Sequence, residues 1–188
     1  MVSAALAGGT RVVQYRNKTA SVELRREQAR ALKLACDAHG AALIVNDHAD
    51  LAREIDAAGV HIGADDGDLA GARDQLGAGK LIGVSCYNRL DSAREAQRAG
   101  ADYVAFGSFF ASSVKPGAVH APLELAREAR AALDVPIVAI GGITIDNARP
   151  LVDAGVDAVA VISALFGAAD IAAAARELNA LFGSETGR

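Results

Sequence analysis

The chain of 188 residues has no tryptophan, only one methionine and two cysteines, and aromatic residues make up 4% of it. Two cysteines, Cys36 and Cys86, give no disulfide framework and are typical of reduced thiols in the cytoplasm. No stretch reaches the roughly 18 apolar residues of a membrane-spanning helix. The first residues lack the basic region and apolar run of a signal peptide. We therefore expect a cytoplasmic protein.

Strong charge is also missing. The formal net charge is −4, and no basic stripe or block of like charges occurs. We therefore expect neither nucleic acid nor an anionic membrane as a partner. What the chain has is apolar residues, at 52%, which is enough for one sizeable core. This predicts one domain over residues 1–188 and leaves open whether the chain forms a homo-oligomer.

One short pattern recurs, in which a glycine ends a helical run and a short apolar strand follows. The glycine has a physical reason, because it can adopt the left-handed conformation that satisfies the last helical carbonyls. The strands are continuous apolar runs without alternation, as expected for a parallel sheet covered on both faces. They are predicted near residues 11–15, 42–45, 60–62, 81–84, 102–106, 136–140 and 157–161.

Strands that alternate with helices predict an α/β fold, and we favour a (β/α)₈-type barrel from which the first strand is missing. A doubly wound open sheet is the competing topology. Polar residues follow every strand, however, instead of gathering at one switch point. Because Val2–Gly8 has the pattern of a helix end, we expect the codons upstream to encode an apolar strand and the start of that helix.

Functional residues of such barrels follow the strands. The first visible strand is followed by Gln14, Tyr15, Arg16, Asn17 and Lys18. If the strand persists to residue 18, the side chains of Gln14, Arg16 and Lys18 point the same way. Two cations and an amide would then converge on an anion with several oxygens, such as a phosphate. The alternative interpretation is a solvated strand end.

Carboxylates follow the next two strands. Asn46 and Asp47 come after the second, and an acidic turn that includes Asp66 comes after the third. Carboxylates at neighbouring strand ends can share a hard cation such as Mg²⁺. The alternatives are a helix N-cap for Asp47 and a helix-opening turn for the acidic run.

Small and hydroxyl residues follow the later strands and can contact phosphate. The pair Gly141-Gly142 lets backbone amides approach an anion, and the loop over 107–117 is long enough to be functional. None of the four histidines is taken as a general base. The candidates in these loops are Ser85, Ser112, Ser113, Lys115, Gly142, Ile162 and Ser163.

These residues, in this order, resemble the thiamine-phosphate synthase family over essentially the whole chain. The Gln-x-Arg-x-Lys motif resembles Gln14 to Lys18, and the Asn-Asp pair resembles Asn46 and Asp47. Other motifs of the family are similar to Gly59–Asp66, Gly83–Ser85, Ser112–Lys115 and Ile140–Ile143.

The resemblance implies an enzyme that joins hydroxymethylpyrimidine diphosphate to carboxythiazole phosphate, giving thiamine phosphate, pyrophosphate and CO₂. It also implies Mg²⁺ on Asp47 and Asp66, and catalytic roles for Arg16, Lys18, Ser85 and Lys115. Residues Gln14–Lys18, Asn46, Ser85 and Lys115 would bind the pyrimidine diphosphate. The thiazole phosphate would be held by Ser112, Ser113, Val114, Gly142, Ile162 and Ser163.

Two departures from the family pattern leave alternatives open. Strand one is absent, and Ser112 and Val114 stand where the family has threonines. A sister branch that isomerises the thiazole precursor is the first alternative, and a non-catalytic phosphate-binding barrel is the second. Arg16, Lys18, both aspartates and Lys115 together favour the synthase.

Overall fold

The computed structural model describes residues 1–63, 68–111 and 119–183. Its core is one parallel sheet of seven strands in the sequential order β1 to β7. The strands are β1 (Val12–Tyr15), β2 (Ala42–Asn46), β3 (Gly59–Gly63), β4 (Leu81–Tyr87), β5 (Tyr103–Phe106), β6 (Ile137–Ile140) and β7 (Ala158–Ala160). The helices are α1 (Val2–Ala7), α2 (Val22–Asp37), α3 (Ala49–Glu54), α4 (Leu69–Leu76), α5 (Leu90–Arg98), α6 (Leu123–Ala132), α7 (Ile145–Asp153), α8 (Ser163–Phe166) and α9 (Ile171–Ala180).

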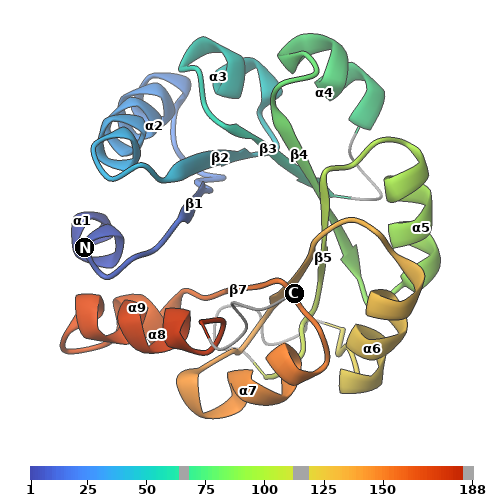
Figure 1. Cartoon of the computed structure of the whole chain (residues 1–188). Coiled ribbons are helices and arrows are strands. Elements are labelled where there is room, and N and C mark those ends of the chain that lie inside the picture. Colours follow the sequence, from blue (N-terminus) through green and yellow to red (C-terminus); the bar gives the residue numbers. More distant parts are fainter. Residues whose placement is uncertain (64–67, 112–118, 184–188) are drawn as a thin grey trace.

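The sheet curls into an incomplete barrel with the helices outside it (Figure 1). Within the described residues β1 and β7 pair only with β2 and β6, so the barrel is open between its first and last strands. The predicted strands all form, and the barrel prediction is confirmed. A doubly wound sheet would reverse its strand order, and this sheet does not.

Alternate residues of each strand face two different environments. Val45 of β2, Val60 of β3 and Val104 of β5 have no exposed surface and belong to the core between strands and helices. The residues that alternate with these valines along each strand face the inside of the barrel. Both faces are thus covered along the central strands, which explains why their sequences are nearly continuous apolar runs.

The glycine rule of the sequence analysis holds at some helix ends and is wrong at Gly59 and Gly79, since Gly79 has no positive φ and α4 ends at Gly77, with a φ of 82°. Gly40 and Gly155 do adopt positive φ, at 64° and 92°. Gly59 instead lies inside β3, where a side chain would collide with the backbone of Leu81. The left-handed residue before β3 is Asp56, with φ of 54°. Gly59 is therefore required by close strand packing and not by a helix end.

Two aspartates tie neighbouring strands together at the N-terminal end of the barrel. Asp102, just before β5, accepts from the backbone N–H of Ile82 at 2.7 Å and pairs with Arg73. Asp157, just before β7, accepts from the N–H of Ile137 at 2.7 Å and pairs with Arg130. Because this end of such barrels carries stability and not chemistry, we assign both aspartates to the fold.

The opening between β1 and β7 is bordered by α1 and α9, which pack against each other. Ala5 of α1 and Ala175 of α9 share a small buried cluster with Leu165 of α8. The Asn179 amide donates to the carbonyl of Gly8 at 3.2 Å. A Cβ on Gly8 would lie 2.4 Å from the carbonyl oxygen of Ala172. The absence of a side chain at Gly8 is therefore what lets the two helices approach.

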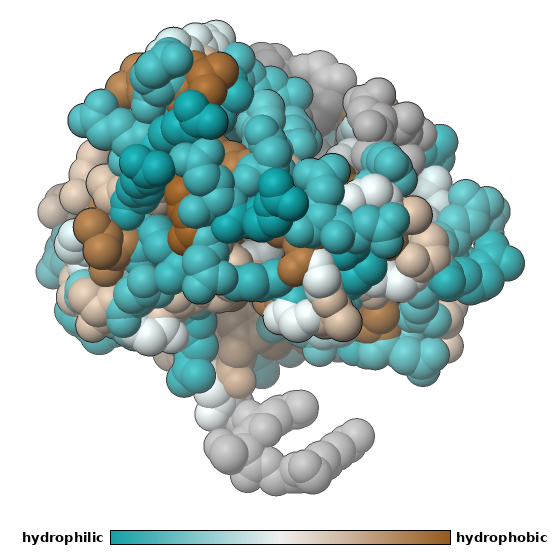
Figure 2. Space-filling model, turned by 90° about the horizontal axis from the view of Figure 1, so that it is seen from above, coloured by the Kyte–Doolittle hydropathy of each residue, from teal (hydrophilic) through white to brown (hydrophobic). Residues whose placement is uncertain are grey.

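The outer surface is mostly hydrophilic on the face seen in Figure 2, where apolar residues are scattered among polar ones. No helix in the described part of the chain is long and apolar enough to span a membrane.

We predict that Gly8→Ala lowers the free energy of unfolding by about 1–3 kcal/mol, as for other overpacked contacts. Gly79→Ala is the matched control, because nothing lies within 4 Å of a Cβ at Gly79. Urea unfolding of both variants gives the measurement. Equal stability of the two would mean that α1 and α9 do not need this close approach.

Candidate active site

A polar layer crosses four neighbouring strands inside the barrel. Backbone pairing sets Asn46 beside His61, His61 beside Gly83, and Gly83 beside Tyr103. Gly83 has no side chain, and a Cβ there would lie 1.9 Å from the Tyr103 ring. The rings of His61 and Tyr103 therefore meet across the gap, with centroids 5.6 Å apart.

The imidazole of His61 joins two hydroxyl groups. Its Nε2 lies 2.7 Å from the Ser85 Oγ, and its Nδ1 lies 3.0 Å from the Tyr103 hydroxyl. Ser85 lies one step closer to the mouth, the open end formed by the C-terminal ends of the strands. There Ser85 pairs with Gly63 and Ala105, two small neighbours that leave it partly exposed.

Burial sets the protonation states of this layer. His61 is 8% exposed, and burial lowers its pKa to about 4 against a smaller opposing effect of the Asp47 carboxylate. Burial, with the nearby Asp102, also raises the pKa of the Tyr103 phenol above its ordinary value. At neutral pH the imidazole is uncharged and the phenol keeps its proton.

Residues 14–18, at the end of β1 and just beyond it, direct their side chains to two different sides of the sheet. The Gln14 amide donates to the Asn46 Oδ1 at 3.2 Å. Tyr15 is buried on the other side, where its hydroxyl and the Asn17 amide both donate to Gln28 of α2, at 2.8 and 3.1 Å. β1 ends at Tyr15, so the expectation that the strand persists to residue 18 is wrong.

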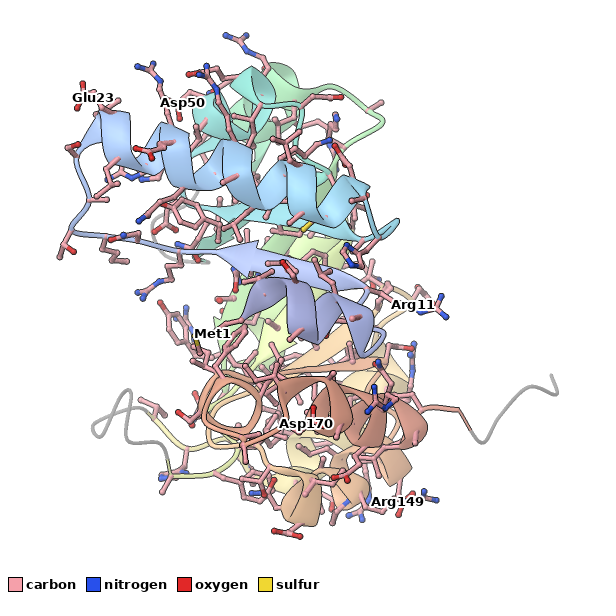
Figure 3. All side chains as sticks on the ribbon, turned by 90° about the vertical axis from the view of Figure 1, so that its left-hand side faces the viewer. Met1, Arg11, Glu23, Asp50, Arg149 and Asp170 are labelled. Carbon is pink, nitrogen blue, oxygen red and sulfur yellow. The ribbon has the colours of Figure 1, made fainter. Side chains whose placement is uncertain are left out.

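The cations of this segment lie beyond the strand and stay exposed. Arg16 is an exposed residue just after β1. Lys18 reaches the second strand end, where its Nζ lies 3.7 Å from an Asp47 carboxylate oxygen. Figure 3 shows that Glu23, at the start of the helix that follows, lies at the opposite end of this βα unit from Arg11. The segment therefore faces the mouth.

Asp47 has an unusual backbone. Its φ is 65°, and its N–H donates to the carbonyl of His61 at 2.9 Å. The N-cap of α3 is His48, without a side-chain capping bond, so the N-cap alternative for Asp47 is wrong. Its carboxylate is 44% exposed and has only the long contact with Lys18 among the described ion pairs. A hard cation could use these oxygens.

The paired glycines after β6 hold two loops together. The N–H groups of Phe109 and Phe110 donate to the carbonyls of Ile140 and Gly141, at 3.1 and 3.0 Å. Gly142 has a φ of 63°, and a Cβ there would lie 2.3 Å from the carbonyl oxygen of Ala111. The Gly-Gly pair is thus needed for loop packing, besides any contact with an anion.

The remaining predicted residues divide into two groups. Ile162 precedes the four-residue helix α8, which Ser163 begins, and both residues are exposed after β7. Asp66 and the loop residues Ser112, Ser113, Val114 and Lys115 lie outside the described residues.

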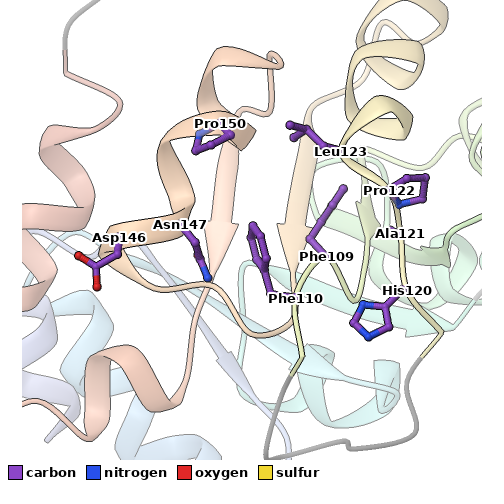
Figure 4. A pocket seen from close by; sticks show the side chains of 9 residues that line it. All are labelled: Phe109, Phe110, His120, Ala121, Pro122, Leu123, Asp146, Asn147 and Pro150. Atoms are coloured by element: carbon purple, nitrogen blue, oxygen red, sulfur yellow. The ribbon is translucent and has the colours of Figure 1, made fainter.

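A cavity of about 570 Å³ lies elsewhere, between the loop after β5 and the starts of α6 and α7. Figure 4 shows its two phenylalanines, Phe109 and Phe110, between Asn147 of α7 and Leu123 of α6. None of the predicted site residues lines it. Among the described residues that line it, Asp146 is acidic and none is a lysine or an arginine. Such a lining does not suit a multiply charged anion, so we place the site at the mouth.

Comparison with known proteins identifies the family of the chain. A family model described as thiamine monophosphate synthase matches residues 1–165. The thiamine-phosphate synthase of Nitrosospira multiformis is 54% identical over 178 residues, which are 95% of this chain and 76% of that protein. That of Methylobacillus flagellatus is 55% identical over 179 residues, or 95% and 85% of the two chains. The chain belongs to the thiamine monophosphate synthase family.

Solved structures agree with this membership. Thiamine phosphate pyrophosphorylase from Pyrococcus furiosus matches with a TM-score of 0.88 and 35% identity, over 99% of this chain and 89% of that one. A 3-hexulose-6-phosphate synthase matches with a TM-score of 0.71 and 24% identity, over 97% and 94% of the two chains. The second match shows the fold alone.

The sequence analysis missed two residues of the polar layer, His61 and Tyr103. No histidine, His61 included, was taken as a general base, and Tyr103 was not considered. A signal was present, because residues 61, 83 and 103 occupy matching inward positions of three successive strands. A glycine between two ring-bearing residues in such a row predicts that the rings meet.

We predict that Gly142→Ala destabilises the fold more than Gly40→Ala, by about 1–3 kcal/mol. The two glycines have nearly equal φ, at 63° and 64°, so both variants carry the same left-handed strain. A Cβ at Gly142 would collide with the backbone of Phe110 and Ala111, whereas nothing lies within 4 Å of a Cβ at Gly40. Urea unfolding midpoints measure the difference. Equal losses would contradict the loop-packing role.

Proposed function

We propose that this chain condenses hydroxymethylpyrimidine diphosphate with carboxythiazole phosphate, releasing pyrophosphate and CO₂ and forming thiamine phosphate. The membership of the family and the names of its close relatives support this reaction. The observation that carries it is the convergence of an amide pair, a lysine–aspartate pair and a serine at one barrel mouth. These are groups that bind phosphates, a metal ion and a polar ring.

The diphosphate would lie over the ends of β1, β2 and β4. Arg16 and Lys18 would bind its oxygens, because an arginine fork matches a phosphate and a lysine supplies a point charge. Gln14, Asn46 and Ser85 line the inner side of the same region and would contact the pyrimidine diphosphate. We extend this set to Lys115, Tyr15 and Asn17 from the resemblance of the motifs. The contacts of Tyr15 and Asn17 with Gln28 indicate that they act by holding the segment on α2.

Asp47 fits a Mg²⁺ ligand. Its carboxylate is partly exposed and does not cap α3. Mg²⁺ is usually held by one or two carboxylates together with substrate phosphates, so few protein ligands are needed. We propose Asp66 as the second carboxylate from its motif. The ion would supply positive charge that neutralises the departing diphosphate.

The thiazole phosphate would be held on the other side of the mouth. Gly142 and Ser163 follow adjacent strands, β6 and β7, and α8 is a short extra helix of the kind that often borders a phosphate site in this fold. We assign Ile162 and Ser163 to this side. Ser112, Ser113 and Val114 join them from the motif alone.

The chemistry then requires no protein nucleophile. The bond between the pyrimidine methylene carbon and the diphosphate oxygen breaks, and pyrophosphate leaves with the electron pair. The thiazole nitrogen donates its lone pair to that carbon. The thiazole carboxylate then leaves as CO₂, and the electron pair left on its ring carbon takes up a proton from solvent. The protein contributes cations at the leaving group and alignment of the two rings. We also propose that the enzyme works in the cytoplasm, since both cysteines are buried thiols.

The deciding experiment incubates the purified protein with both substrates and Mg²⁺ and measures pyrophosphate, CO₂ and thiamine phosphate. All three products should appear together and only when both substrates are present. Conversion of a thiazole precursor in the absence of pyrimidine diphosphate would favour the isomerase. The absence of any turnover would contradict an enzymatic function.

We predict that Asp47→Asn abolishes Mg²⁺-dependent turnover while the fold is kept. Asparagine tolerates left-handed backbone well, so the substitution removes charge without adding strain. Asp50→Asn is the control, since Asp50 is an exposed residue in the first turn of α3. Pyrophosphate release is measured over a Mg²⁺ titration. Near-normal activity of Asp47→Asn would remove Asp47 from the metal site.

We predict that Arg16→Ala lowers kcat by about 10²–10³, the usual cost of losing one well-placed charge donor. Arg16→Lys should recover only part of this, because a bidentate fork becomes a point charge. Arg11→Ala is the control, because Arg11 lies at the opposite end of β1 (Figure 3). Single-turnover rates check the prediction. A fully active Arg16→Lys enzyme would show that Arg16 only attracts the substrate.

A further inference from the structure

A hydrogen-bonded chain runs from Tyr103 through His61 to Ser85, and the proposed function uses Ser85 but neither His61 nor Tyr103. We propose that His61 is a positioning residue whose Nε2–H donates to the Ser85 Oγ, so that the Ser85 hydroxyl hydrogen points to the mouth and donates to the substrate. Ser85 would touch the substrate, whereas His61 would act through it. The direction of the hydrogen bonds follows from the groups that are present.

The His61 imidazole can carry its proton in only a few ways. The His61 ring is 8% exposed and both ring nitrogens face neutral hydroxyls, so neither nitrogen of a charged ring would be bonded to a carboxylate of the described residues. A neutral imidazole has one N–H and one acceptor nitrogen. The proton is therefore on Nε2, facing Ser85, or on Nδ1, facing Tyr103.

Tyr103 decides between these two arrangements. Among the described residues, the Nδ1 of His61 is the only hydrogen-bond partner of the Tyr103 hydroxyl. If Nδ1 carried the proton, the buried phenolic O–H would have no acceptor. A buried donor without an acceptor is costly, whereas an oxygen with an unused lone pair costs less. Tyr103 therefore donates to Nδ1, and the proton of the imidazole lies on Nε2.

The surrounding strands hold this arrangement in place. The two rings stack with an interplanar angle of 29°, and the missing side chain of Gly83 leaves the room for them. Ser85 lies between the small residues Gly63 and Ala105 on the neighbouring strands. Its Oγ accepts from the ring below, and its hydrogen is free to turn toward the mouth.

The arrangement selects the atom that the substrate presents. A serine that already accepts from His61 offers a donor, so the substrate atom beside it must be an acceptor, such as a phosphate oxygen or an unprotonated ring nitrogen. A substrate amino group beside Ser85 would instead place its N–H donors against the O–H donor of the Ser85 hydroxyl. This consequence rests on the proposed function, whereas the position of the proton on His61 does not.

The first test is ¹⁵N NMR of the substrate-free protein labelled at histidine. The His61 signals are assigned by their loss in His61→Gln, and His39→Gln serves as the control because His39 is exposed at the end of α2. We expect a protonated Nε2 and an acceptor Nδ1 in the wild type. A protonated Nδ1 in the wild type would overturn the proposal.

The second test is a double-mutant cycle in kcat. His61→Gln keeps an N–H near the Nε2 position and should stay within about tenfold of wild type. His61→Leu removes the donor and should cost about 10–10². In a Ser85→Ala background the same His61→Leu change should alter kcat by less than about threefold. Equal losses in both backgrounds would show that His61 is only structural.

The two tests separate the proposal from the function on which it partly rests. If His61→Leu fails to fold, the tautomer and His61→Gln still decide the outcome. A wild-type protein that has the Nε2–H tautomer but makes no thiamine phosphate would contradict the proposed function alone. A wild-type synthase with the opposite tautomer would contradict the inference alone.

Discussion

Parallel pairing in one register across β2 to β5 determines which side chains meet at the mouth. It sets Asn46, His61, Gly83 and Tyr103 in one row, with Ser85 one step above. A slip of one residue in any of these strands would turn the inward row toward the helices and bring valines and isoleucines inside. The bonds from Gln14 to Asn46 and from His61 to Ser85 depend on this register as much as on the residues that make them.

The register is fixed at the end of the barrel opposite the chemistry. Asp102 bonds the backbone of β4 and Asp157 bonds the backbone of β6, each from the start of the neighbouring strand. Their partners Arg73 and Arg130 are partly exposed, so the ion pairs themselves contribute little. The backbone bonds matter more, because they bond strand N–H groups at fixed positions. Residues at the mouth can thus be chosen for binding without having to hold the strands together.

Local patterns were sufficient to predict the strands, because each is an apolar run bounded by turn residues. They also predicted that Gln14, Asn46, Asp47 and Ser85 lie near the C-terminal strand ends, where the structure has them, while the binding roles of these residues stay predictions. They were not sufficient for contacts that need three strands at once, and so His61 and Tyr103 were missed. Nor could they show that Tyr15 faces α2, because that depends on where β1 stops. The parts of the prediction that rest on Asp66 and Lys115 stay predictions.

His61 bonds two residues of the mouth, Ser85 and Asp47, through different atoms. Its side chain holds Ser85, and its backbone carbonyl accepts from the N–H of Asp47. That second bond holds Asp47 in a left-handed conformation, which costs on the order of 1–3 kcal/mol for a non-glycine residue. The strain has a structural consequence, because it turns the aspartate away from the capping position of α3 and leaves its carboxylate beside Lys18. His61 therefore positions both Ser85 and Asp47. The distance between the Ser85 hydroxyl and the Asp47 carboxylate depends on the His61 side chain and on the His61 backbone carbonyl.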